Sequence, residues 1–189
     1  DSFLHRFVGD FALRTPLLAR SPNASADLAH GVGGAVAPKL FDKLNVEWTG
    51  LFCESDGSFP NHHPDPTVVA NLQDLIAKVR STGADLGVAF DGDADRIGVV
   101  DEHGSIVWGD HVLILYARDV LERTGAGQPI IFDVKCSQAL PDEILKAHGE
   151  PVMWKTGHSL MKDKMREVNA PVAGEMSGHM FFTEGFYGH

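Results

Sequence analysis

Three aspartates stand within five positions of the chain, in the segment 91–96, which reads Asp-Gly-Asp-Ala-Asp-Arg. Carboxylates this close repel one another, and a cation that they share offsets the repulsion. Mg²⁺ takes oxygen ligands in a near-octahedral arrangement and keeps positions open for water or phosphate oxygens. We therefore predict that Asp91, Asp93 and Asp95 bind a divalent cation, with Mg²⁺ as the best match.

Arg96 closes this segment and adds a planar guanidinium that suits phosphate oxygens. Apolar runs at residues 86–90 and 97–100 flank the segment and predict strands on both sides. Open α/β sheets place their ligands at the carboxyl ends of such strands. The loop could therefore hold a metal and contact an anionic ligand together.

Three other interpretations of the loop remain. An EF-hand would also use Glu102, but Arg96 stands where that loop needs a glycine. A strand that ends in Asp-x-Asp also resembles haloacid-dehalogenase-type phosphatases, in which Asp91 would be the nucleophile. A solvated acidic turn is less expected, because such turns seldom need three acids and an arginine between buried strands.

Composition limits the class of protein. The 189 residues are 43% hydrophobic and 22% charged, which fits one large or two small globular domains. The formal net charge of −10 argues against a broad nucleic-acid or anionic-membrane surface, so an anionic substrate must meet local cations. Cys53 and Cys136 lack metal-binding spacing and favour a reducing cytoplasm. The chain shows neither a membrane-length apolar run nor an opening signal peptide.

Predicted strands and helices alternate, which favours an α/β fold of two tandem three-layer domains with mixed, largely parallel sheets. Because the pattern restarts near Gly109, we place the domains at 1–108 and 109–189. Strands are expected at 46–52, 86–90, 97–101, 105–108, 130–134, 151–154 and 171–173. Helices are expected at 36–44, 67–81 with Thr67 as the cap, 111–123, 138–149 and 160–169.

Polar segments follow the last three parallel strands, at 135–137, 155–159 and 174–179. One polar strand end would mean little, because loops are polar. Three in series, each with a potential phosphate or hydroxyl ligand, predict one shared site.

Four segments in order carry a resemblance to a known family. They are 59–66 (Phe-Pro-Asn-His-His-Pro-Asp-Pro), 91–96, 155–158 (Lys-Thr-Gly-His) and 174–179 (Gly-Glu-Met-Ser-Gly-His). Together they resemble the phosphomannomutase/phosphoglucomutase branch of the α-D-phosphohexomutase superfamily. The resemblance covers the second and most of the third of the family's four domains.

This resemblance implies an isomerase that moves a phosphoryl group between the 1 and 6 oxygens of a hexose through a phosphoserine enzyme. It implies Mg²⁺ at Asp91, Asp93 and Asp95, catalytic roles for Arg96, Lys135 and His158, and sugar binding by Glu175, Ser177 and His179. Each residue also has a structural interpretation: His158 could cap a helix, Glu175 could be a surface acid and Lys135 a solvated strand end. For His62 and His63 we favour a scaffold role in the proline-rich loop. A non-catalytic sugar-phosphate binding module remains an alternative.

The sequence departs from the family in three respects. It stops at residues 187–189, where the family continues into an acidic pair and a helix, so we expect the third domain to be truncated at its C-terminus. The family's phosphoserine loop, Thr-Ala-Ser-His-Asn-Pro, is not in these 189 residues, so we expect a fragment that is inactive alone. Family members also begin the second domain with an apolar strand that runs into a turn of the type Asp-Ala-Gly-Asn-Gly. The corresponding residues 20–31 have few β-branched or aromatic side chains, which argues against a central strand there.

Overall fold

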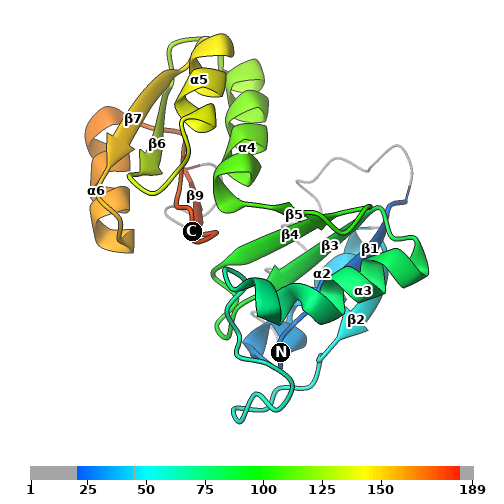
Figure 1. Ribbon diagram of the computed structural model, residues 1–189. Coiled ribbons are helices and arrows are strands. Elements are labelled where there is room, and N and C mark those ends of the chain that lie inside the picture. Colours follow the sequence, from blue (N-terminus) through cyan, green and yellow to red (C-terminus); the bar gives the residue numbers. More distant parts are fainter. Residues whose placement is uncertain (1–20, 45, 184–189) are drawn as a thin grey trace. The chain divides into compact units, whose positions relative to one another are not determined.

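The computed structural model describes residues 21–44 and 46–183, which form two compact units (Figure 1). The division lies between Ile106 and Val107. Each unit is a mixed, largely parallel sheet with helices on both faces, so the predicted α/β class is confirmed. None of the helices in the described part of the chain is long and apolar enough to cross a membrane.

The first unit is built on a sheet of strand order β2-β1-β3-β4-β5, in which β1 is parallel to β2 and β3 and β4 is antiparallel to β3. Ala26 and Val88 pack with Ala37 of α2 on one face, and Ala89 and other side chains pack against α3 on the opposite face. In chain order the elements are β1 (Asn23–Asp27), η1 (Val32–Ala35), α2 (Ala37–Lys43), β2 (Glu47–Leu51), η2 (Val69–Leu72), α3 (Gln73–Thr82), β3 (Leu86–Phe90), β4 (Ile97–Asp101) and β5 (Ile106–Val107).

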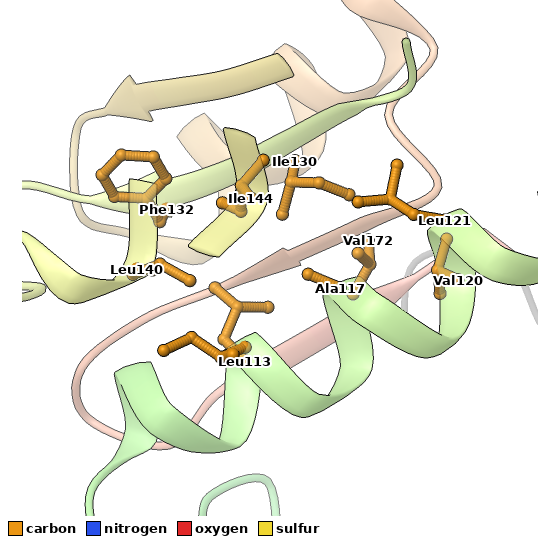
Figure 2. Packing of buried hydrophobic residues seen from close by; sticks show 10 residues of the cluster. Leu113, Ala117, Val120, Leu121, Ile130, Phe132, Leu140, Ile144 and Val172 are labelled. Atoms are coloured by element: carbon orange, nitrogen blue, oxygen red, sulfur yellow. The ribbon is translucent and has the colours of Figure 1, made fainter. Parts of the chain in front are cut away.

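The second unit is built on a sheet of order β7-β6-β8-β9, in which β6 is parallel to β7 and β8 and β9 is antiparallel to β8. Figure 2 shows Leu113 and Ala117 of α4 facing Ile130 and Val172 of the sheet, and α6 covers the other face through Met161 and Met165. The elements are α4 (Gly109–Thr124), β6 (Pro129–Asp133), α5 (Ala139–Lys146), β7 (Glu150–Trp154), α6 (His158–Val168), β8 (Val172–Gly174) and β9 (Met180–Phe182).

The two units share one topology, because β1, β2, β3 and β4 correspond in order and direction to β6, β7, β8 and β9. The central strands β1 and β6 both end in a fully buried aspartate, Asp27 and Asp133. The residues directly after β3 and β8 are the buried acids Asp91 and Glu175. Each unit therefore places two buried carboxylates at the carboxyl ends of its parallel strands.

The expectation that residues 20–31 hold no central strand is wrong. Asn23–Asp27 is an interior strand of its sheet, between β2 and β3, with Ala24, Ser25 and Ala26 all buried. Small side chains fit this strand because helices pack closely on both faces of the sheet. The hydroxyl of Ser25 lies beside that of Thr82 in α3 (Oγ to Oγ1, 3.5 Å). The residues before this strand, up to residue 20, lie outside the described part of the chain.

The helix expected from Thr67 also begins elsewhere. Thr67 donates its backbone N–H and its hydroxyl to Oδ1 of Asp65, and α3 starts at Gln73 after the short η2 helix. Thr67 is therefore part of the preceding turn, because a carboxylate two residues earlier takes both of its donors. The remaining predicted strands and helices are confirmed to within a few residues at each end.

Replacement of Ala26 by valine tests the packing of β1. Valine has the higher strand propensity, but it would add two methyl groups between tightly packed layers. We expect Ala26→Val to lower the free energy of unfolding by about 1–3 kcal/mol, measured by urea denaturation. The control Thr49→Val, on the half-exposed edge strand β2, should change it by less than about 0.5 kcal/mol. Equal stability of Ala26→Val and the parent chain would contradict this account of the strand.

Candidate functional site

The acidic loop, residues 91–96, is folded around the Asp91 carboxylate. Oδ1 of Asp91 accepts hydrogen bonds from the backbone N–H groups of Asp95 (3.0 Å) and Arg96 (3.1 Å). Oδ2 accepts from Nε of Arg96 at 2.6 Å. Ala94 takes the left-handed conformation (φ 61°), which turns the chain back so that Asp95 reaches Asp91. The loop is therefore held by one buried side chain with several donors.

Electrostatics keep Asp91 ionised. Burial raises the pKa of Asp91, but the hydrogen bonds from Arg96 and its positive charge prevail and hold the pKa below its usual value. Burial lowers the pKa of Arg96, and the bond to Asp91 with the nearby acids raises it above its usual value. Asp91 and Arg96 thus form a partly buried ion pair at the end of β3.

The donor set of the loop fits a hard divalent cation. Asp91, Asp93 and Asp95 each offer a carboxylate oxygen, and these oxygens lie within 4.8 Å of one another. Octahedral Mg²⁺ at about 2.1 Å from each ligand places opposite oxygens about 4.2 Å apart, so the spacing is suitable. Asp93 and Asp95 are exposed and can turn toward an ion that Asp91 anchors. The three predicted ligands are therefore brought together.

Two neighbouring segments hold this loop in place. Val32 donates its N–H to the carbonyl of Gly92 (3.0 Å), and a Cβ on Gly31 would lie only 2.7 Å from that oxygen. On the other side, a Cβ on Gly92 would touch the ring of Pro64 at 3.4 Å. The turn after β1 and the proline-rich loop thus pack on the acidic loop, and Gly31 is required because no larger residue fits there.

The buried Asp27 anchors the proline-rich loop. Oδ1 of Asp27 accepts from the N–H of Ala29 (2.9 Å), and Oδ2 lies 3.0 Å from Nε2 of His62. Nδ1 of His62 donates to the carbonyl of His63 (3.0 Å), so His62 joins the buried Asp27 to the backbone of the proline-rich loop. Burial raises the pKa of Asp27 despite the bonds from Ala29 and His62. These contacts place His62 as a scaffold residue.

Asp133 has the equivalent place in the second unit and joins three loops. Its Oδ1 accepts from the N–H of Met176 (3.0 Å) and from the thiol of Cys136 (3.2 Å), and its Oδ2 accepts from the hydroxyl of Thr156 (2.9 Å). Nζ of Lys135 lies 3.7 Å from the same carboxylate. The three polar strand ends are therefore brought together, as the sequence predicted.

Glu175 organises the turn 174–179. Its Oε1 accepts from the N–H of Gly157 at 2.6 Å, and its Oε2 accepts from Nδ1 of His179 at 2.8 Å. The hydroxyl of Ser177 lies 2.9 Å from the same His179 nitrogen. Glu175 is only 2% exposed, so it is a buried acid and its interpretation as a surface residue is wrong.

Lys135 and His158 lie around this turn. His158 is the first residue of α6, and its ring packs edge-on against the rings of His179 (centroids 4.3 Å apart) and Phe181 (5.0 Å). The side chain of Lys135 is 57% exposed beside Asp133. A cationic group and an imidazole thus border the Glu175 turn, an arrangement suited to an anionic ligand that carries hydroxyl groups.

Sequence reasoning missed the buried acids that support both loops. Asp110 is 1% exposed, and its Oδ2 accepts a hydrogen bond from the N–H of Ser137 (2.9 Å). Burial raises the pKa of Asp110, but the bonds from Ser137 and His111 prevail and lower it. Asp27 and Asp133 also hold loops in place, through the hydrogen bonds that their carboxylates accept. Only Asp133 carried a signal in the sequence, because it ends an apolar strand and a side chain buried there needs donors from elsewhere in the fold.

Comparison with known proteins gives a consistent result. A family model described as phosphoglucomutase/phosphomannomutase, alpha/beta/alpha domain II, matches residues 5–104, and the model for domain III matches residues 108–188. A phosphomannomutase/phosphoglucomutase of Pseudomonas putida is 52% identical over 188 residues, which is 100% of this chain and 39% of that protein. The chain thus spans about two fifths of the length of this curated relative.

Solved structures agree with this match. A phosphoglucomutase/phosphomannomutase family protein from Burkholderia thailandensis has a TM-score of 0.90 at 49% identity, covering 100% of this chain and 40% of that one. N-acetylphosphoglucosamine mutase from Aspergillus fumigatus, solved with GlcNAc-6P and magnesium, has a TM-score of 0.68 at 20% identity, covering 94% of this chain and 39% of that one. The second likeness shows the fold.

Replacement of Gly31 by alanine tests the close packing on the acidic loop. The added Cβ would meet the carbonyl oxygens of Gly92 at 2.7 Å and Asp91 at 3.0 Å, so the loop must move. We expect Gly31→Ala to lower the free energy of unfolding by about 1–3 kcal/mol and to shift the amide NMR signals of residues 91–96. The control Gly57→Ala meets nothing within 4 Å and should do neither. Unchanged amide signals in Gly31→Ala would count against the predicted contact.

Replacement of Thr156 tests how Asp133 joins the loops. Thr156→Val keeps the shape but removes the hydroxyl that donates to Asp133, so a buried carboxylate loses a donor. We expect a loss of about 1.5–3 kcal/mol in the free energy of unfolding, by urea denaturation. Thr156→Ser keeps the donor and should cost clearly less. Equal losses in both variants would show that the hydrogen bond is unimportant.

Proposed function

Because this chain belongs to the phosphoglucomutase/phosphomannomutase family and carries its domains II and III, we propose that it is the metal-binding and sugar-binding part of a magnesium-dependent phosphohexomutase. The whole enzyme would interconvert hexose 1-phosphate and hexose 6-phosphate through a phosphoserine. The phosphoserine loop of the family is not in these 189 residues, so we expect no turnover by the chain alone.

In the first unit, Asp91, Asp93 and Asp95 would hold Mg²⁺. When bound, Mg²⁺ offsets negative charge on the phosphoryl group that is transferred. Arg96, fixed on Asp91, would direct its remaining N–H groups to phosphate oxygens. These roles fit a reaction in which positioning and charge stabilisation provide most of the catalysis.

In the second unit, Glu175, Ser177 and His179 would bind sugar hydroxyls. The carboxylate oxygens of Glu175 keep lone pairs beyond those used by Gly157 and His179, so they can accept from a hydroxyl group. Lys135 would stabilise the charge of the phosphoryl group, and His158 would move or hold a proton near the sugar.

One observation carries this proposal: two carboxylate-centred loops occupy the same place in two units of the same topology, with different donors around them. Asp91 is paired with a guanidinium and two further acids, which suits a dication. Glu175 is surrounded by neutral donors and a histidine, which suits hydroxyl groups. The family match supports the proposal that both loops serve one reaction.

The alternatives from the sequence are less well supported. A haloacid-dehalogenase-type phosphatase would use Asp91 as a nucleophile, but both matching family models are phosphoglucomutase/phosphomannomutase domains, which does not favour that alternative. A sugar-phosphate binding module without turnover would still use the Glu175 turn. The two free thiols, Cys53 and Cys136, support a cytoplasmic location. The net charge of −10 argues against nucleic acid or an anionic membrane as a partner, and the proposed partner is a hexose phosphate.

Calorimetric titration of the chain with MgCl₂ and, separately, with a hexose phosphate tests the two roles. We expect Asp93→Asn to weaken Mg²⁺ binding at least about tenfold, because one ligand loses its charge. Glu175→Gln should leave Mg²⁺ affinity within about twofold and weaken sugar-phosphate binding about tenfold or more.

The exposed variant Asp163→Asn serves as the control for general loss of negative charge, since Asp163 lies on the surface of α6. It should change neither affinity. Intact Mg²⁺ affinity in Asp93→Asn would rule out the acidic loop as the metal site. Intact hexose-phosphate affinity in Glu175→Gln would rule out the sugar-binding role of the turn.

A further inference from the structure

We propose that Asp65 is a positioning residue for the acidic loop. In this proposal, which rests on the proposed metal site, Asp65 holds one end of the Arg96 guanidinium and so limits how strongly Arg96 neutralises Asp91. The carboxylate of Asp91 then stays available to Mg²⁺. Asp65 itself has no place in the set of predicted metal ligands.

Arg96 is shared between two carboxylates. Its Nε donates to Oδ2 of Asp91 at 2.6 Å, and its Nη1 donates to Oδ1 of Asp65 at 3.1 Å. Both side chains are about one quarter exposed, 23% for Arg96 and 25% for Asp65, so the pair is partly desolvated. Each carboxylate therefore receives a single N–H from the guanidinium.

This shared geometry differs from the usual pairing of arginine with a carboxylate. A guanidinium placed against one carboxylate usually donates two parallel N–H bonds, and that arrangement binds more strongly. Without the pull of Asp65, Arg96 could turn and donate two N–H groups to Asp91. Arg96 would then compete more strongly with a dication for the same oxygens.

Asp65 is well fixed for this task. Its Oδ1 also accepts from the N–H (3.0 Å) and the hydroxyl (2.8 Å) of Thr67, and its carbonyl accepts from Nδ2 of Asn71 (2.9 Å). Burial raises the pKa of Asp65, but the bonds from Thr67 and the charge of Arg96 prevail and lower it. The carboxylate is therefore held, ionised, in one orientation.

The loop that carries Asp65 is itself anchored on both sides. His62 reaches the buried Asp27 at the end of β1. Pro66 packs so closely on β4 that a Cβ on Gly98 would come within 2.8 Å of its ring. Fixed φ angles at Pro64 and Pro66 limit the motion of the residue between them. The position of Asp65, and with it that of Arg96, is therefore set by the scaffold.

A double-mutant cycle on Mg²⁺ affinity tests the proposal. The four chains are the parent, Asp65→Asn, Arg96→Gln and the double variant, each titrated with MgCl₂ by calorimetry. Asparagine keeps an oxygen for Thr67 but loses the charge that holds Arg96. We expect Asp65→Asn to weaken Mg²⁺ binding by about 3- to 10-fold in the parent and by less than about twofold in the Arg96→Gln background.

The Arg96→Gln background separates positioning from simple loss of charge. If Asp65 acted only as a distant negative charge, its replacement would weaken Mg²⁺ binding equally in both backgrounds, and this result would overturn the proposal. The matched control is Asp56→Asn, because Asp56 makes the same two bonds to the residue two positions on, Ser58, at 2.9 and 2.8 Å. This control should leave Mg²⁺ affinity unchanged.

A metal-free measurement keeps the proposal testable if the parent chain binds no Mg²⁺. The ¹⁵N–¹H signals of the Arg96 guanidinium should shift in Asp65→Asn and stay unchanged in Asp56→Asn. If the parent chain binds no Mg²⁺ but the Arg96 signals shift in Asp65→Asn, the proposed metal site is rejected. The contact by which Asp65 holds Arg96 is then still supported. Unchanged Arg96 signals in Asp65→Asn would overturn that hold.

Discussion

A carboxylate buried at the end of a central strand must receive hydrogen bonds from other parts of the chain, and this requirement fixes the loops of both units. Asp27 and Asp133 are fully buried, so each unmet lone pair would cost free energy comparable to a lost hydrogen bond. The donors come from segments far along the sequence, such as His62 and Met176. The loops that could bind a ligand are therefore placed by the demands of the scaffold.

The two units place a buried acid at the same point of one topology and surround it with different groups. Both place an acid directly after the third parallel strand, and both surround it with donors that keep it in one orientation. In the first unit the donors include the charged Arg96, and two exposed aspartates lie nearby, so the loop concentrates opposite charges. In the second unit the donors to Glu175 are a backbone N–H, a hydroxyl and an imidazole. Under the proposed function, the two exposed aspartates beside Asp91 suit a cation, and the mostly neutral donors around Glu175 suit hydroxyl groups.

Local patterns in the sequence predicted the alternating elements and the clustering of Asp91, Asp93 and Asp95, because spacing and strand ends are local properties. The central strand Asn23–Asp27 was missed because alanine and serine suit it only when helices cover both faces, and that is a property of the folded unit. Asp65 and Arg96 are 31 positions apart, and Asp133 and Met176 are 43 apart, so no local pattern could pair them. Thr67 was misjudged because a threonine suits two positions equally well. It can cap a helix, or it can lie in a turn and donate hydrogen bonds to a preceding aspartate, here Asp65.

The central claim is that the acidic loop is already shaped, by its bonds to Asp91, to receive a divalent cation. Paramagnetic broadening of amide NMR signals by Mn²⁺, used in place of Mg²⁺ at less than one equivalent, tests this claim most directly. The account predicts that the signals of residues 91–96 broaden first and recover when excess Mg²⁺ is added. Broadening that begins at exposed surface acids such as Asp142 and Asp163, with residues 91–96 unaffected, would contradict it.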